Sequence, residues 1–267
     1  MKKHILFAAL ALVVPALLSC EKENSTPPHE LIVYGEIDGH EYVDLGLRSG
    51  GNKILFATMN VGASAPEEYG DYFAWGETTK RYTSISGGAI TGGTFEWSNC
   101  PYHTGQDVYS GWSKYIPAGK GSYSVSGMTD NLLSLEASDD AAHVQWGNGW
   151  RTPNSSELEY LLSESVTREW VEDYNQTGAA GLLIRGRGAY SEASIFLPAA
   201  GKCFMNTWDS GYEHNGHYWS SEVCDDFPAA VASLLFNDAG ETMIFEDRYR
   251  GFSVRPVITV QFPEGVI

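Results

Sequence analysis

The clearest pattern of apolar and polar positions in the sequence lies between residues 146 and 162. Pro153 disfavours a helical conformation for the residue before it, Asn154 is a good helix N-cap, and Glu157 lies three residues later, as in a capping box. The apolar positions that follow recur at the spacing of one helix face: Leu158, Leu161 and Leu162. This pattern predicts a glycine-punctuated bend followed by a helix that begins after Pro153.

Runs of alternating or branched apolar residues predict strands in most of the remaining chain. The expected strands are 32–37, 41–47, 54–61, 181–187, 194–197, 216–221, 229–237 and 241–246. The Asp38-Gly39 pair predicts a tight turn between the first two, and the last three are expected to form a meander. A second short helix is expected over 138–146, with Ser138 or Asp139 as its cap. The residues 251–257 are expected to form the closing strand.

Periodicity fades between Thr78 and Leu135, where glycine, serine, threonine and tyrosine dominate. A loop of this length in a compact domain is either functional or held down by its own side chains. The aromatic residues available for that are Trp97, Tyr109, Trp112, Tyr115 and Tyr123.

Composition indicates one globular domain and excludes some partners. The chain has 267 residues, of which 43% are hydrophobic and 13% aromatic, and its formal net charge is −17. These values are typical of a globular, loop-rich fold, which we expect to span residues 31–267 as a single domain. The acidity makes nucleic acid an unfavourable partner.

The N-terminal residues have the pattern of an export signal. Lys2 and Lys3 precede an apolar run that is short for a membrane span, so residues 1–19 are expected to be a signal peptide. Residues 17–20, Leu-Leu-Ser-Cys, resemble a bacterial lipobox, which implies a lipid on Cys20 and a tether over residues 20–30. Membrane attachment is then expected through this lipid only, in an outer-membrane lipoprotein exposed on the cell surface.

Six ordered blocks together resemble the Fibrobacter succinogenes major paralogous domain, which is abundant in lipoproteins of gut Bacteroidetes. The blocks are Asp44-Leu-Gly-Leu, Asn60-Val-Gly-Ala with Tyr69-Gly-Asp-Tyr-Phe-Ala-Trp-Gly-Glu, the 140–157 block, Phe196-Leu-Pro-Ala-Ala-Gly, Tyr218-Trp-Ser-Ser and Gly251-Phe-Ser-Val-Arg-Pro. The resemblance covers 36–257, least well over 78–135. It implies a C-type-lectin-like α+β fold with short, mostly antiparallel strands, two short helices and long aromatic- and glycine-rich loops. It implies no activity for this chain.

Within the resemblance, the 146–162 segment is expected to be scaffold. Trp146 and Trp150 would pack the helix against a sheet, and Arg151 would form an internal ion pair. Tyr218 and Trp219 belong to a block as well and are expected in the core.

The positions of the cysteines and acidic residues are relevant to whether the protein is an enzyme. The fold's relatives include copper-dependent oxidases that use a cysteine pair near the end of the domain, and Cys100, Cys203 and Cys224 do not match such a pair. A glycosidase would need two placed carboxylates, which the sequence does not single out among its 34 acidic residues. We therefore expect no enzyme. Because exported cysteines usually pair, we expect a Cys203–Cys224 disulfide.

A binding surface is the remaining expectation. The late loops and strands are rich in Trp, Tyr and Arg, which supply much of the energy of recognition. The expected contacts are those outside the family blocks: Trp208, Tyr212, His214, Asp225, Asp226, Asp247, Arg248 and Tyr249. The expected ligand is a glycan or a protein on a cell or matrix surface. The alternative is a structural component of a surface assembly.

Calcium is left open as a cofactor, although none is required. Asp225-Asp226 resembles the loop where calcium-dependent lectins place oxygen ligands. The Glu-Pro-Asn, Gln-Pro-Asp and Trp-Asn-Asp tripeptides of such lectins are absent from the sequence, which disfavours calcium-dependent sugar binding.

Overall fold

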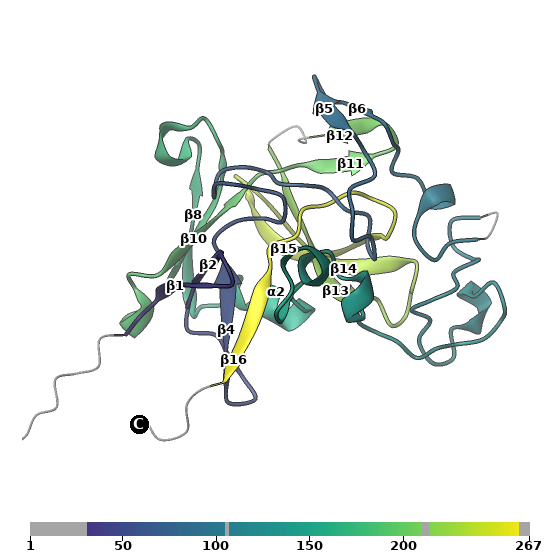
Figure 1. The fold of residues 1–267 in the computed structure, drawn as a ribbon, viewed down its shortest axis with the longest axis horizontal. Helices are drawn as coiled ribbons and strands as arrows, with labels where there is room; N and C mark the ends of the chain where they lie inside the picture. Colours follow the sequence, from purple (N-terminus) through teal and green to yellow (C-terminus); the bar gives the residue numbers. More distant parts are fainter. Residues whose placement is uncertain (1–30, 105–106, 210–213, 262–267) are drawn as a thin grey trace, which may run out of the picture. The chain divides into compact units, whose positions relative to one another are not determined.

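The early strands and the final strand of the chain form one antiparallel sheet. The computed structural model describes residues 31–104, 107–209 and 214–261, so the predicted signal peptide, Cys20 and the tether to residue 30 lie outside the described residues. The sheet has the order β1-β2-β4-β16-β7, with β3 also paired to β4. Its strands are β1 (Tyr34–Ile37), β2 (His40–Val43), β3 (Arg48–Ser49), β4 (Asn52–Ala57), β7 (Trp150–Arg151) and β16 (Val257–Gln261). In Figure 1, β4 in blue and β16 in yellow run side by side.

The turn between β1 and β2 is the one that the sequence predicts. Asp38 and Gly39 have φ angles of 54° and 83°, the left-handed backbone that a two-residue hairpin loop requires at both positions. The predicted strands 41–47 and 54–61 both end early, at Val43 and Ala57. The expected closing strand over 251–257 begins only at Val257, and residues 251–253 make isolated bridges instead.

Three smaller sheets, all with antiparallel strand pairs, account for the other strands of the described chain. One has the order β10-β9-β8, another β11-β12-β6-β5, and the third is the predicted meander β13-β14-β15. Their bounds are β5 (Ser84–Ser86), β6 (Ala89–Thr91), β8 (Val166–Val171), β9 (Gly181–Gly186), β10 (Ser194–Pro198), β11 (Lys202–Phe204), β12 (Thr207–Asp209), β13 (Gly216–Val223), β14 (Ala230–Asn237) and β15 (Gly240–Asp247). The architecture is thus mostly antiparallel β with two short α-helices and several 3-10 turns.

The predicted helix after Pro153 is α2 (Ser155–Tyr160). Its capping box is confirmed: the Asn154 side chain accepts from the Glu157 backbone N–H, and the Glu157 carboxylate accepts from the Asn154 backbone N–H. Two of the three predicted leucines are buried, and the third packs against the same cluster: Leu158, Leu161 and Leu162. Local capping and apolar spacing therefore determine this helix and its orientation.

The second helix, α1 (Ala141–Trp146), begins one or two residues later than the sequence predicts. Its N-cap is Asp140, whose carboxylate accepts from the backbone N–H groups of Ala142 and His143. The expected caps, Ser138 and Asp139, instead belong to a preceding 3-10 turn at Ala137–Asp139. Of several adjacent polar residues that can cap, Asp140 does so because its carboxylate also accepts from the Thr152 N–H and hydroxyl, in the bend before α2.

Trp150 anchors the bend as expected. It is fully buried, packs edge-on against Trp146 at 5.3 Å between ring centroids, and lies against Leu55, Ala57 and Ile258 of the six-stranded sheet. Arg151 forms the predicted internal ion pair, with a nitrogen 2.6 Å from a Glu157 carboxylate oxygen. The bend and the helix are therefore scaffold, fixed to the sheet through Trp150.

The 78–135 segment is mostly irregular, and buried side chains hold it in place. Trp112 and Tyr115 are completely buried. The Asp130 carboxylate accepts from the backbone N–H groups of Tyr115, Ile116 and Leu132. The bonds from Tyr115 and Ile116 satisfy backbone groups of buried residues, and the bond from Leu132 closes a turn at the surface.

A second carboxylate fastens this segment to the start of α1. Buried Asp139 accepts hydrogen bonds from the Tyr115 hydroxyl and the Lys114 ammonium group. Burial alone would raise the pKa of Asp139, but the hydrogen bonds from Lys114, Tyr102 and Tyr115 outweigh it and lower the pKa to about 2.

We expect Trp150→Ala to lower the free energy of unfolding by roughly 3–5 kcal/mol, the range for truncating large buried aromatic residues. Chemical denaturation measures the loss. Trp150→Phe, which keeps an aromatic ring in the same space, is the matched control and should lose less. An alanine variant as stable as the native chain would contradict the role of Trp150 as an anchor.

We expect the stability that Asp139 supplies to depend on pH. Because its folded pKa is below the value of about 3.9 for a free aspartate, this stability is fully present above pH 4 and is lost as the pH falls through about 2. Asp139→Asn should therefore destabilise the protein at pH 6, and the difference from the native chain should shrink toward pH 2. Denaturant unfolding at both pH values measures it, with exposed Asp225→Asn as the control. A difference that does not change with pH would contradict the assignment.

Candidate functional site

An open cavity of about 520 Å³ lies beside the sheet that contains β5, β6, β11 and β12. Its volume is within the range of small-molecule sites. Aromatic rings and glycines make up most of its wall: Tyr69, Gly70, Tyr72, Tyr82, Ile85, Gly87, Gly88 and Trp208. We call it the aromatic cavity. Trp208 is the one predicted contact residue among those that line it.

Trp208 is held in one orientation by its own indole nitrogen. Its Nε1–H donates to the Ala200 carbonyl at 2.9 Å and lies 2.8 Å from the Tyr72 hydroxyl oxygen. The Tyr72 hydroxyl in turn donates to the same carbonyl. Tyr69 stacks against Trp208 with 6.0 Å between ring centroids and 24° between planes. The cavity therefore presents pre-oriented aromatic faces.

The turn between β5 and β6 forms another part of the wall. Gly87 and Gly88 have φ angles of 56° and 80°, which a two-residue hairpin loop requires and which other residues adopt only with strain. The Gly88 carbonyl accepts from the Trp208 backbone N–H at 2.8 Å. This bond ties the hairpin to β12 and closes one side of the cavity.

The wall of the aromatic cavity carries no charged side chain. Burial raises the pKa values of Tyr69, Tyr72 and Tyr82, so all three stay protonated at neutral pH. The hydroxyls of Tyr72 and Tyr82 are used inside the protein, by the Ala200 carbonyl and the Asp71 carboxylate. This surface is suited to stacking on a neutral ring.

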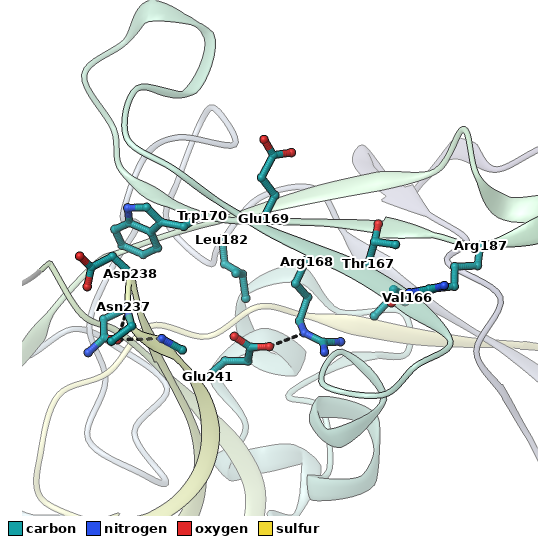
Figure 2. Close-up of a pocket in the computed structure, with 12 residues that line it drawn as sticks. Val166, Thr167, Arg168, Glu169, Trp170, Leu182, Arg187, Asn237, Asp238 and Glu241 are labelled. Carbon is teal, nitrogen blue, oxygen red and sulfur yellow. Dashed lines mark hydrogen bonds and ion pairs between the residues drawn. The ribbon is translucent and has the colours of Figure 1, made fainter.

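A second concave region, which we call the β8 groove, lies between β8 and the turn from β14 to β15 (Figure 2). Its volume is also about 520 Å³. The lining is polar for the most part and includes both signs of charge: Arg168, Glu169, Arg187, Asp238 and Glu241, with Trp170 as the aromatic member. No predicted contact residue belongs to it.

The other predicted contacts do not gather around either region. His214, Asp225 and Asp226 are exposed, and the Asp226 carboxylate lies 3.1 Å from the Lys120 ammonium. Asp247 is half-buried and pairs with Arg250 at 3.4 Å. Tyr212 lies outside the described residues. The described residues contain no group of three or more His, Cys, Asp or Glu side chains placed to hold a metal ion.

Arg248 and Tyr249 correct the prediction, since both are buried in the core. Arg248 is 1% exposed and donates to the carbonyls of Lys114 and Tyr115, at 3.0 and 2.6 Å. Its guanidinium lies over the ring of Trp112, 4.5 Å from the centroid. A planar cation with several donors suits this role, because it can satisfy carbonyls in the irregular 78–135 segment while stacking on aromatic rings. Its residue type alone does not distinguish this role from ligand contact.

The structure also differs from the predicted Cys203–Cys224 disulfide, because both residues are free thiols. Cys203 is fully buried in β11, opposite Trp208. Cys224 follows β13, where its backbone N–H donates to the Ala230 carbonyl. The two thiols therefore belong to different sheets. Cys100 is a free, buried thiol as well.

Sequence reasoning missed most of the aromatic cavity. Tyr69 and Tyr72 belong to one of the six blocks and are not among the expected contacts, and Tyr82 and Ile85 lie in the segment without periodicity. The Gly87-Gly88 pair, which is typical of a hairpin turn, is the signal that marks this wall in the sequence.

Comparisons with known proteins identify no relative. No protein-family model matches the chain, and neither curated proteins nor solved structures give a significant match. Within residues 31–104, 107–209 and 214–261, no helix is long and apolar enough to cross a membrane.

We expect Arg248→Met to destabilise the protein by about 2–5 kcal/mol, because it leaves two buried carbonyls without their donor. Denaturant unfolding measures the loss. Asp225→Asn, a substitution at an exposed residue, is the control and should change stability by less than about 0.5 kcal/mol. A stable Arg248→Met variant would contradict a core role for Arg248.

Proposed function

We propose that this protein is a binding protein whose aromatic cavity takes a glycan. The observation that carries the proposal is the fixed set of aromatic faces around an open cavity without charged side chains. Aromatic rings stack well on the apolar face of a sugar ring, and rings held in place lose little freedom when a ligand binds. A neutral sugar needs no ion pair from the protein.

The proposal includes a cell-surface setting. A lipid on Cys20 would anchor the chain to the outer membrane, and residues 20–30 would separate the domain from the bilayer. Binding, with no enzymatic step, is then the expected activity, and calcium is an optional addition to it.

We propose further that the domain has a C-type-lectin-like fold. Support comes from its content: short antiparallel strands, two short helices, and long loops rich in aromatic residues and glycine. The expected scaffold residues Tyr218 and Trp219 are both buried. The Trp219 indole N–H donates to the Phe73 carbonyl at 2.8 Å, which joins two of the blocks that carry the resemblance.

The test is a glycan array probed with the native chain and with Trp208→Ala. We expect the native chain to bind at least one neutral glycan, and Trp208→Ala to weaken that binding by roughly 30-fold, as truncated aromatic hot spots do. Tyr109→Ala, which removes an exposed aromatic ring outside the cavity, should bind like the native chain. Binding is measured with calcium and with a chelator.

Because Trp208 also contacts the core, thermal unfolding of each variant is measured as well. It shows whether a loss of binding comes from a loss of folding. A folded Trp208→Ala variant with unchanged glycan binding would refute the proposed site. If the array shows no glycan and a pull-down from cell envelope recovers a protein partner through the same cavity, the structural alternative replaces the glycan.

A further inference from the structure

The β8 groove differs from the aromatic cavity in its chemistry. Its floor is formed where Trp170 of β8 pairs across the strands with Leu182 of β9. The Trp170 ring is partly exposed and packs against the main apolar cluster. Its Nε1–H donates to the Glu172 carboxylate at 2.8 Å, which fixes the ring's orientation. At one end of the groove, the Trp170 ring therefore forms an aromatic surface with a fixed orientation.

The middle of the groove is fixed by an ion pair that joins two sheets. The Arg168 Nε lies 2.5 Å from a Glu241 carboxylate oxygen, and Arg168 also donates to the Ser163 carbonyl at 2.7 Å. Figure 2 shows these two side chains meeting across the groove. Because each charge has its partner, the pair presents polar atoms to a ligand without a net charge.

Two further side chains at the groove, Asp238 and Arg187, carry hydrogen-bonding groups and are exposed. Asp238 is exposed in the turn between β14 and β15, and in Figure 2 it lies at the same end as Trp170. At the other end, the exposed Arg187 donates from Nε to the Val166 carbonyl at 3.1 Å, which fixes the position of its guanidinium group at the groove. The groove thus has carboxylate acceptors at one end and guanidinium donors at the other.

The geometry points to the β8 groove as a second ligand site, one that takes a short neutral oligosaccharide. Hydroxyl groups both donate and accept, so they match a lining that has fixed acceptors and fixed donors beside an aromatic face. The side chains follow β8 from Val166 to Trp170, a length of about 13 Å at the usual rise per strand residue. This length favours a chain of sugars over a single one.

Charge argues against an acidic ligand. Among the residues that line the groove, Arg168 is paired with Glu241 and Glu169 with Arg185, and the charge of exposed Asp238 offsets that of Arg187, so the lining has no excess positive charge to hold an anion. The protein as a whole carries a net charge of −17, which repels anions at a distance. A neutral ligand, held by hydrogen bonds and ring stacking, needs no unpaired positive charge in the groove and is not repelled by the net negative charge of the protein.

The test is saturation-transfer NMR and calorimetry on the purified full-length chain with maltotriose, cellotriose and mannotriose as probes. We expect at least one trisaccharide to bind. Asp238→Asn keeps a residue that suits a turn, and it should weaken that binding about tenfold because it replaces a charged acceptor. Trp170→Leu should weaken it at least as much. Glu164→Gln, which changes an exposed acid outside the groove, is the matched control.

The outcomes separate this site from the aromatic cavity. Groove binding should survive in Trp208→Ala, and binding that is lost in Trp208→Ala but retained in Asp238→Asn would overturn the groove as the site. Failure of all three trisaccharides to bind would overturn it too. Since Asp238 is exposed, its variant remains decisive even if Trp170→Leu fails to fold.

Discussion

A buried hydrogen-bond network around Arg255 is the constraint on which the rest of the structure depends. Arg255 is 1% exposed and donates to the Asn60 side chain, to the carbonyls of Ala57 and Thr58 at the end of β4, and to the Phe196 carbonyl in β10. The Asn60 amide lies 3.2 Å from the Tyr218 hydroxyl, which donates to the Pro198 carbonyl. One guanidinium group and its neighbours therefore connect the six-stranded sheet, the β8–β10 sheet and the meander. A buried cation is costly unless its donors are used, and here the Asn60 side chain and carbonyls at the end of β4 and within β10 accept from them.

The same network positions the aromatic cavity. The Tyr69 carbonyl accepts from the Asn60 amide at 3.0 Å and from the Ser253 hydroxyl at 3.2 Å, so the backbone at the rim of the cavity is fixed to the core. On the other side, the Ala200 carbonyl, two residues after Pro198, holds the Tyr72 hydroxyl and the Trp208 indole. The residues that form the walls of the cavity are therefore hydrogen-bonded to residues in or next to the Arg255 network. An aromatic surface built this way can be rigid although β5, β6 and β12 have only three residues each.

Local signals predicted the parts of the fold in which one short segment decides its own structure. The capping box of α2, the Asp38-Gly39 turn and the meander strands follow from adjacent residues, and the structure confirms them. What the sequence could not show is where a long-range partner determines the outcome. Arginine is a residue type typical of binding surfaces. Arg248 is nevertheless buried in the core, because it donates to the carbonyls of Lys114 and Tyr115, more than 130 residues earlier in the chain. The aromatic cavity was missed for the same reason, because its walls come from Tyr69, Tyr82 and Trp208, which meet only in the folded chain.

The aromatic cavity and the β8 groove differ in how closely their lining residues are connected to the core. This difference determines how freely the lining residues of each region can be substituted. The aromatic cavity depends on Tyr69 and Tyr72, which lie in a block near the Arg255 network, so a change there also disturbs the core. In the β8 groove, Asp238 and Arg187 are exposed, with the Arg187 Nε bonded to the Val166 carbonyl, whereas Val166, Trp170 and Leu182 contribute to packing. Substitution at Asp238 alters the chemistry of the groove at little cost in stability, since exposed substitutions away from special features usually change stability by less than about 0.5 kcal/mol. On physical grounds, the groove is therefore the region where ligand preference can change without loss of the fold.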